Sequence, residues 1–128
     1  MIQIKDASVT RELLIESYHP ILIELVLWIL QRYYNITFTS GYREGDKSVH
    51  GTKPCRGLDI RSRDLEKITT ENFLTGITYP IDAKELCDEL NSAWQYDPER
   101  PDMMVCKLHD TGKGMHCHLQ VHKNTRMI

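Results

Sequence analysis

The sequence predicts a small single α+β domain in which an antiparallel sheet packs against helices. Three observations predict this fold class: a strongly apolar, helix-like segment near the start, short alternating segments after it, and two strand-like segments joined by a glycine-containing turn at the end. Because helices and strands are intermixed and the last two strands form a hairpin, an α+β arrangement is favoured. The length of 128 residues is typical of one domain, here residues 1–128.

The N-terminal half is expected to contain the main helix and two strands. The helix is predicted over residues 17–34, because Pro20 suits its first turn, where a missing N–H costs nothing. A short helix over residues 7–16 is a further expectation. The β-branched, alternating residues 35–40 predict a strand, and a loop over residues 45–57 leads to a second strand over residues 57–62. On that strand Leu58 and Ile60 face one side, whereas Asp59 and Arg61 face the other.

The C-terminal half is expected to contain a second helix and the hairpin. Residues 82–85 form a capping-box pattern that opens a helix through about residue 96. Residues 103–108 and 115–122 are predicted as strands, joined by a turn over residues 110–114.

Composition and charge exclude several classes of protein. The net charge of −2 argues against a nucleic-acid partner, because nucleic-acid-binding domains usually carry a basic excess. The most apolar run, residues 21–30, contains Glu24 and is too short to cross a bilayer, so we expect no membrane insertion. The first residues do not resemble a signal peptide. We therefore expect a cytoplasmic protein, or one that another factor releases.

The four cysteines are spaced widely and contain no CxxC pair. We interpret them mainly as small buried apolar residues in a reducing compartment, and a disulfide is the less favoured alternative. They are Cys55, Cys87, Cys106 and Cys117.

The last predicted strand carries an unusual row of histidines. His116, His118 and His122 alternate with apolar residues, so one face of the strand is apolar and the other displays imidazoles. A half-solvated strand that happens to be rich in histidine would explain this pattern. A metal site is the sharper interpretation, but a His-x-His pair alone is weak evidence, because zinc needs at least three protein ligands.

A second segment supplies further candidate ligands. His50 and Asp59 are nine positions apart, and the turn-forming residues between them allow the chain to fold back. Taken singly, His50 fits an exposed loop residue equally well, and Asp59 fits a strand-end carboxylate paired with Arg56 or Arg61. Together with the histidine strand, they provide two imidazoles, a carboxylate and a spare base.

Three segments resemble the family of zinc D-Ala-D-Ala carboxypeptidases and L-alanyl-D-glutamate endopeptidases, which shares its core fold with lysostaphin-type peptidases and the hedgehog signalling domain. The segments are Ser-Gly-Tyr-Arg at 40–43, Ser-Val-His-Gly with Gly-Leu-Asp-Ile inside 48–60, and His-Cys-His-Leu-Gln-Val at 116–121. Small phage-encoded or prophage-encoded members are the most similar in size. The resemblance extends from about residue 38 to residue 121.

The resemblance implies that His50, Asp59 and His118 bind Zn²⁺, that His116 is the catalytic histidine beside the metal, and that Arg43 contacts a substrate carbonyl or carboxylate. Two departures from the family pattern stand out. The spacing from the first histidine to the aspartate is two residues longer than the usual one. The position three residues before His118 is a methionine, so only the His-x-His variant of the site fits.

Other polar residues of these segments have less specific roles. Ser48 is a candidate for substrate binding or for capping the loop. Asp46 is a candidate for orienting a ligand imidazole through its second nitrogen. We expect His122 to be peripheral and His19 to be structural, whereas nothing in the sequence sets the direction of His109.

Three functions compete at this point. The first is a zinc metallopeptidase acting as a monomer on peptidoglycan stem peptides, with water activated by the metal. The second is a non-catalytic metal-binding or wall-binding module of the same fold, such as a phage structural component. The third is a structural zinc site. Strand alternation disfavours it, because the adjacent residues His116 and Cys117 would point to opposite faces of the strand. Its residues would be Cys106, His109, His116 and Cys117. The enzyme is favoured, because the chain contains both His116 and Arg43, the residues that the resemblance places in catalysis and substrate binding.

Overall fold

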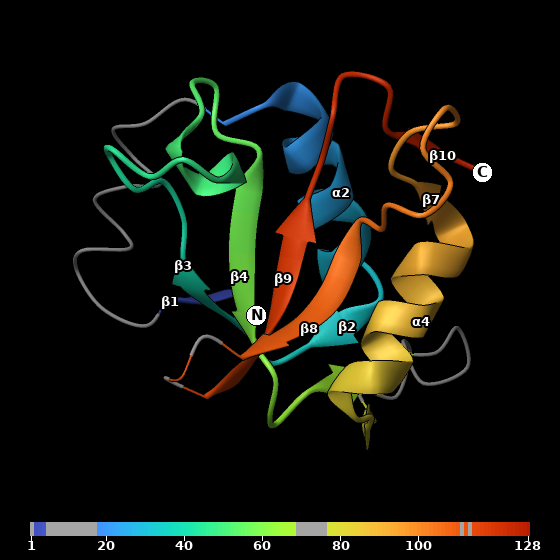
Figure 1. Cartoon of the computed structure of the whole chain (residues 1–128). Helices are drawn as coiled ribbons and strands as arrows, with labels where there is room; N and C mark the ends of the chain where they lie inside the picture. Colours follow the sequence, from blue (N-terminus) through green and yellow to red (C-terminus); the bar gives the residue numbers. More distant parts are fainter. Residues whose placement is uncertain (1, 5–17, 69–76, 111, 113) are drawn as a thin grey trace.

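The computed structural model describes residues 2–4, 18–68, 77–110, 112 and 114–128. The centre is a five-stranded sheet, shown in Figure 1. Its order is β1 (Ile2–Ile4), β3 (Ile36–Ser40), β4 (Gly57–Arg61), β9 (Met115–Gln120) and β8 (Cys106–Asp110). Strand β1 is parallel to β3, and the other three neighbouring pairs are antiparallel. The predicted α+β class is confirmed, and the helix expected over residues 7–16 lies outside the described residues.

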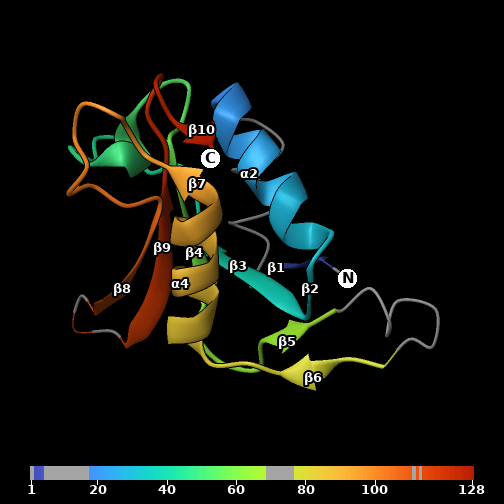
Figure 2. The ribbon, with the colours of Figure 1, turned by 90° about the vertical axis from the view of Figure 1, so that its right-hand side faces the viewer.

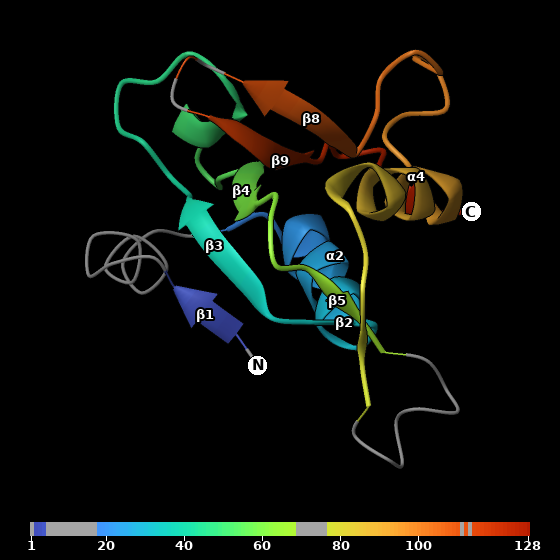
Figure 3. The ribbon, with the colours of Figure 1, turned by 90° about the horizontal axis from the view of Figure 1, so that it is seen from below.

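Two helices, α2 (Pro20–Leu30) and α4 (Ala83–Ala93), cover one face of this sheet. Figure 3 shows both helices on one side of the sheet and the short 3-10 helix η1 (Val49–Gly51) on the other. The core joins apolar side chains of both helices to those of the inner sheet face, namely Leu22, Leu25, Ile29, Leu86, Leu90, Phe38, Leu58, Ile60 and Leu119. No helix within the described ranges combines the length and the apolar character needed to cross a membrane.

Helix α2 is shorter than predicted. The imidazole of His19 accepts a hydrogen bond from the Ile21 N–H at 3.2 Å, and Pro20 follows as the first helical residue. The helix ends at Leu30 because the chain then forms β2 (Tyr33–Tyr34), which pairs with β5 (Glu66–Lys67). Strand β6 (Tyr79–Pro80) completes this small sheet. Figure 2 shows β5 and β6 on the opposite side of the molecule from β8.

Helix α4 starts as predicted and ends early. The Asp82 side chain accepts a hydrogen bond from the Glu85 N–H at 2.8 Å, as expected of the helix cap. The helix ends at Ala93 rather than near residue 96, because the next two residues form β7 (Trp94–Gln95) and pair with β10 (Arg126–Met127). The hairpin strands differ from the prediction, since β8 begins later, at Cys106, and continues to Asp110, whereas β9 ends early, at Gln120.

The register between β4 and β9 separates the sheet into an apolar face and a polar face. Leu58 lies opposite Leu119, and both side chains are buried under the helices. Asp59 lies opposite His118. Because paired residues of neighbouring strands share a face, Asp59 and His118 project from the side away from the helices. The predicted alternation is confirmed for β4 and for β9, whereas His122 lies beyond the end of β9. The four cysteines are free and buried.

Candidate metal centre

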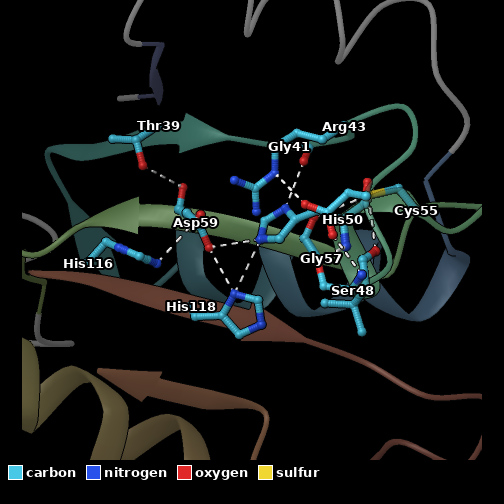
Figure 4. A network of polar contacts seen from close by, with 12 residues as sticks. Thr39, Gly41, Arg43, Ser48, His50, Cys55, Gly57, Asp59, His116 and His118 are labelled. Carbon is cyan, nitrogen blue, oxygen red and sulfur yellow. Dashed lines mark hydrogen bonds and ion pairs between the residues drawn. The ribbon is translucent and has the colours of Figure 1, made fainter. Parts of the chain in front are cut away.

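Three side chains converge at the polar face of the sheet, as Figure 4 shows. The Nε2 atom of His50 lies 3.1 Å from Oδ1 of Asp59 and 3.3 Å from Nδ1 of His118. Nδ1 of His118 lies 2.9 Å from the same carboxylate oxygen. All three residues are buried, and their ligand-type atoms form a group that could hold a metal ion. The nine-position spacing of His50 and Asp59 therefore does bring the two side chains together.

The position of His50 is set by η1 and the loop before it. The hydroxyl of Ser48 accepts a hydrogen bond from the His50 N–H at 3.2 Å, and the Arg43 N–H donates to the His50 carbonyl at 2.7 Å. The Nδ1 atom of His50 lies 2.7 Å from the carbonyl oxygen of Gly41. Because a carbonyl only accepts, this Nδ1 carries a proton, and Nε2 is the His50 nitrogen that faces Asp59 and His118.

The carboxylate of Asp59 stays ionised at this buried position. Burial, the largest effect, raises the pKa of Asp59, but hydrogen bonds from His118 and His50 and the charge of nearby imidazoles outweigh it. The net result is a pKa well below the usual range for a carboxyl group. An ionised Asp59 is the protonation state that a metal ligand requires.

The arrangement of donor atoms fits a small cation. Two imidazole nitrogens and a carboxylate oxygen meet within 3.3 Å of one another, so a cation, either a proton or a metal ion, must balance their lone pairs. Zinc bonds to such ligands at about 2.0–2.1 Å, which places tetrahedral ligand atoms about 3.3 Å apart. The observed separations of 2.9–3.3 Å are close to that value. The group can therefore hold a metal ion, and its donor set is one that zinc accepts.

Two further histidines lie beside this group. Nε2 of His116 is 3.6 Å from Oδ2 of Asp59, the carboxylate oxygen that His50 and His118 do not contact. The ring of His109, whose direction the sequence left open, packs edge-on against His116 at a centroid distance of 5.4 Å. It also lies 6.2 Å from the ring of His118. Strand pairing explains this cluster, because His109 lies opposite His116 in the β8–β9 register.

An open groove of about 1120 Å³ is lined by His50, His109, His116 and His118. Arg43 and Ser48, the predicted substrate-binding residues, line this groove together with the candidate metal ligands His50, Asp59 and His118, called the metal group below. The Arg43 guanidinium forms an ion pair with Asp46 at 3.1 Å, and the Arg43 side chain is about half exposed (48%). The groove therefore brings together every residue that the resemblance implied for the site.

The predicted role of Asp46 is wrong. Its carboxylate pairs with Arg43 and accepts a hydrogen bond from the Ser48 N–H at 2.6 Å, so it shapes the loop before His50. The partner that orients the His50 imidazole is the Gly41 carbonyl. Sequence reasoning missed this partner, since every residue carries a carbonyl group and none stands out.

Residues outside the group also have defined positions. His122, which was expected to be peripheral, contacts Asp97 at 3.6 Å and packs against Tyr96. The alternative structural zinc site is not formed, since Cys106 and Cys117 belong to the core. His109 and His116, its other two members, line the groove on the opposite face.

Gly51 is expected to be essential for holding His50 in place. A Cβ atom at this position would lie 1.7 Å from the backbone carbonyl oxygen of Asp46, so Gly51→Ala must displace the loop. We expect this variant to bind zinc about tenfold more weakly or worse, the scale of a lost positioning contact. Zinc titration against a competing chelator measures the change. The exposed Glu44→Ala in the same loop serves as the control, and parental affinity in Gly51→Ala would contradict this account of the loop.

No family model, curated protein or solved structure matches the chain. The link to the zinc peptidases therefore rests on the motif residues, and the geometry of the site is the independent ground for a functional proposal.

Proposed function

We propose that this protein is a zinc-dependent metallopeptidase that hydrolyses a peptide bond in peptidoglycan stem peptides. One observation carries the proposal: a buried His50–Asp59–His118 group lies in an open groove, with the further imidazole of His116 against the outer oxygen of Asp59. Three protein ligands with one open position are typical of catalytic zinc, whereas structural zinc usually has four. The metal identity and the substrate are both part of the proposal.

The chemistry follows from the ligand set and its neighbours. His50, Asp59 and His118 would hold the zinc, which would supply a water of lowered pKa, near 7, able to attack a carbonyl carbon. His116 lies beside the His50–Asp59–His118 group and lines the groove, so its imidazole would be placed to accept a proton from the attacking water. The same imidazole, once protonated, stabilises the negative charge that develops on the substrate oxygen.

Arg43 and Ser48 are the proposed substrate contacts. The guanidinium of Arg43 offers paired N–H donors in a geometry suited to a carboxylate or a developing oxyanion. Its side chain is about half exposed and lines the groove, so a substrate carboxylate can compete with Asp46 for it. The Ser48 hydroxyl caps η1 by accepting a hydrogen bond from the His50 N–H. Its second lone pair and its O–H remain available to a substrate in the groove.

The second candidate is a non-catalytic metal-binding or wall-binding module of the same fold. The ion pair between Arg43 and Asp46 favours it, because a substrate carboxylate would have to displace Asp46 before it could bind Arg43. A digestion experiment separates the two functions.

The proposed activity is tested by incubating zinc-loaded protein with purified peptidoglycan and with soluble stem-peptide fragments. Mass spectrometry of the products identifies any bond that is cut. We expect cleavage that a chelator abolishes and added zinc restores, and Asp59→Ala protein is the matched control. Intact fragments at full zinc occupancy would reject the peptidase and leave the binding module.

A further inference from the structure

The groove carries positive charge that the protein does not neutralise. Its basic lining residues are Arg43, Arg61, Arg63 and Lys107, and its acidic ones are Asp46 and Asp59. Asp46 pairs with Arg43, and Asp59 belongs to the metal group. Within the described residues, no carboxylate forms an ion pair with Arg61 or Lys107. A chain of net charge −2 thus places two unpaired cations at its candidate site.

The sheet register places these two cations on either side of the histidine strand. Arg61 on β4 lies opposite His116, and Lys107 on β8 lies opposite His118. Since paired residues share a face, both side chains project from the same face as the metal group. The cations therefore flank β9 where it carries the candidate ligand and base.

We propose that Arg61 and Lys107 form an anion subsite that binds carboxylate groups of the substrate next to the bond to be cut. This inference rests on the proposed function and narrows its substrate class to peptides with free carboxylates within the groove. Arginine binds a carboxylate through paired hydrogen bonds, and lysine adds a point charge. Stem peptides whose glutamate carboxylate is free fit this subsite, whereas peptides amidated at that carboxylate lack the charge.

The test measures binding without turnover. Zinc-loaded His116→Ala protein, which is expected to keep its metal without turnover and serves as the parent here, is titrated calorimetrically at low salt with a stem tetrapeptide that has a free glutamate α-carboxylate, and with the same peptide amidated there. We expect the free acid to bind about tenfold more tightly, the scale of one charged hydrogen bond. Arg61→Gln and Lys107→Gln should each reduce this preference, and the double variant should remove it. The exposed Lys123→Gln, outside the groove, should retain it.

Two kinds of negative result distinguish the anion subsite from the proposed stem-peptide substrate. Equal binding of both peptides to the parent, or an unchanged preference in the double variant, would overturn the anion subsite alone. If neither peptide binds the parent, the stem-peptide substrate itself is rejected, and the subsite with it.

A separate observation concerns the thiols behind the site. The sulfur atoms of Cys87 on α4 and Cys106 on β8 lie 2.9 Å apart in the core. A disulfide bond is ~2.0 Å long, so these atoms need to approach by only about 1 Å to bond. Hydrogen bonds from Cys106 and Cys117 lower the pKa of the Cys87 thiol, whereas hydrogen bonds with Cys117 and Cys87 raise that of Cys106. Cys87 is therefore the thiol that ionises more readily.

We infer that Cys87 and Cys106 form a disulfide when the protein meets a small-molecule disulfide. The Cys87 thiolate attacks one sulfur of the small disulfide, which releases one small thiolate and leaves a mixed disulfide on Cys87. The Cys106 sulfur then displaces the second small thiol and passes its proton to it. The product ties α4 to β8, and the small disulfide is reduced to two thiols.

Oxidised glutathione added to the reduced protein tests this inference. After alkylation and proteolysis, mass spectrometry should find a peptide pair joined through Cys87 and Cys106, and the thermal midpoint of the oxidised protein should rise. Cys55→Ala should still form the bond, and Cys87→Ser should not. Full alkylation of both cysteines after oxidation, or a bond that uses Cys117 instead, would overturn the inference.

Discussion

His118→Ala and Asp59→Ala are each expected to lower zinc affinity by at least about 100-fold. Loss of a residue that only supports a ligand already costs 10–100-fold, and these variants remove the ligand atoms themselves. The three ligand-type atoms lie within 3.3 Å of one another, so no neighbouring side chain can take the missing place without moving. Elemental analysis after dialysis against a competing chelator measures the bound zinc.

The control for this experiment is His122→Ala, since His122 contacts Asp97 rather than the metal group. It should retain zinc like the parent. Circular dichroism should show that the ligand variants remain folded, and Asp59→Asn provides a variant of nearly equal shape should Asp59→Ala fail to fold. Zinc retention in both His118→Ala and Asp59→Ala would mean that the ligands have been misassigned.

His116→Ala is expected to keep its zinc and to lose turnover by ~10²–10⁴-fold, the usual contribution of one general acid–base group. The physical reason is its position: Nε2 of His116 lies 3.6 Å from the outer oxygen of Asp59, outside the close three-residue group. Zinc content and the rate of stem-peptide hydrolysis are measured on the same preparation. A loss of metal from this variant would instead make His116 a ligand and reopen the role of His118.

The candidate site was predictable where strand alternation alone determines geometry. Asp59 and His118 face away from the core because Leu58, Ile60, Cys117 and Leu119 take the other face, and that pattern is visible in the sequence. The loop to His50 was different. Its path depends on contacts within the loop such as the hydrogen bond from the Arg43 N–H to the His50 carbonyl, and the residues alone left His50 equally open to an exposed loop position.

The errors at the ends of the two helices have a common physical origin in contacts between distant segments. Residues 33–34 continue the apolar pattern of α2, but pairing with β5 draws them into a strand. Trp94 leaves α4 in the same way, because β10 pairs with it. Asp46 lies close to His50 in sequence, yet the nearby Arg43 and Ser48 N–H satisfy its carboxylate first. Local propensity does not contain these competing partners.

The most direct test of the account is to locate the metal itself. Crystals of zinc-loaded protein, measured on both sides of the zinc absorption edge, give an anomalous difference map that shows where zinc binds. We expect one strong peak bonded to Nε2 of His50, Oδ1 of Asp59 and Nδ1 of His118, at ~2.0–2.2 Å from each. A peak at the cysteine sulfurs, or no peak at the His50–Asp59–His118 group in protein that contains zinc, would contradict it.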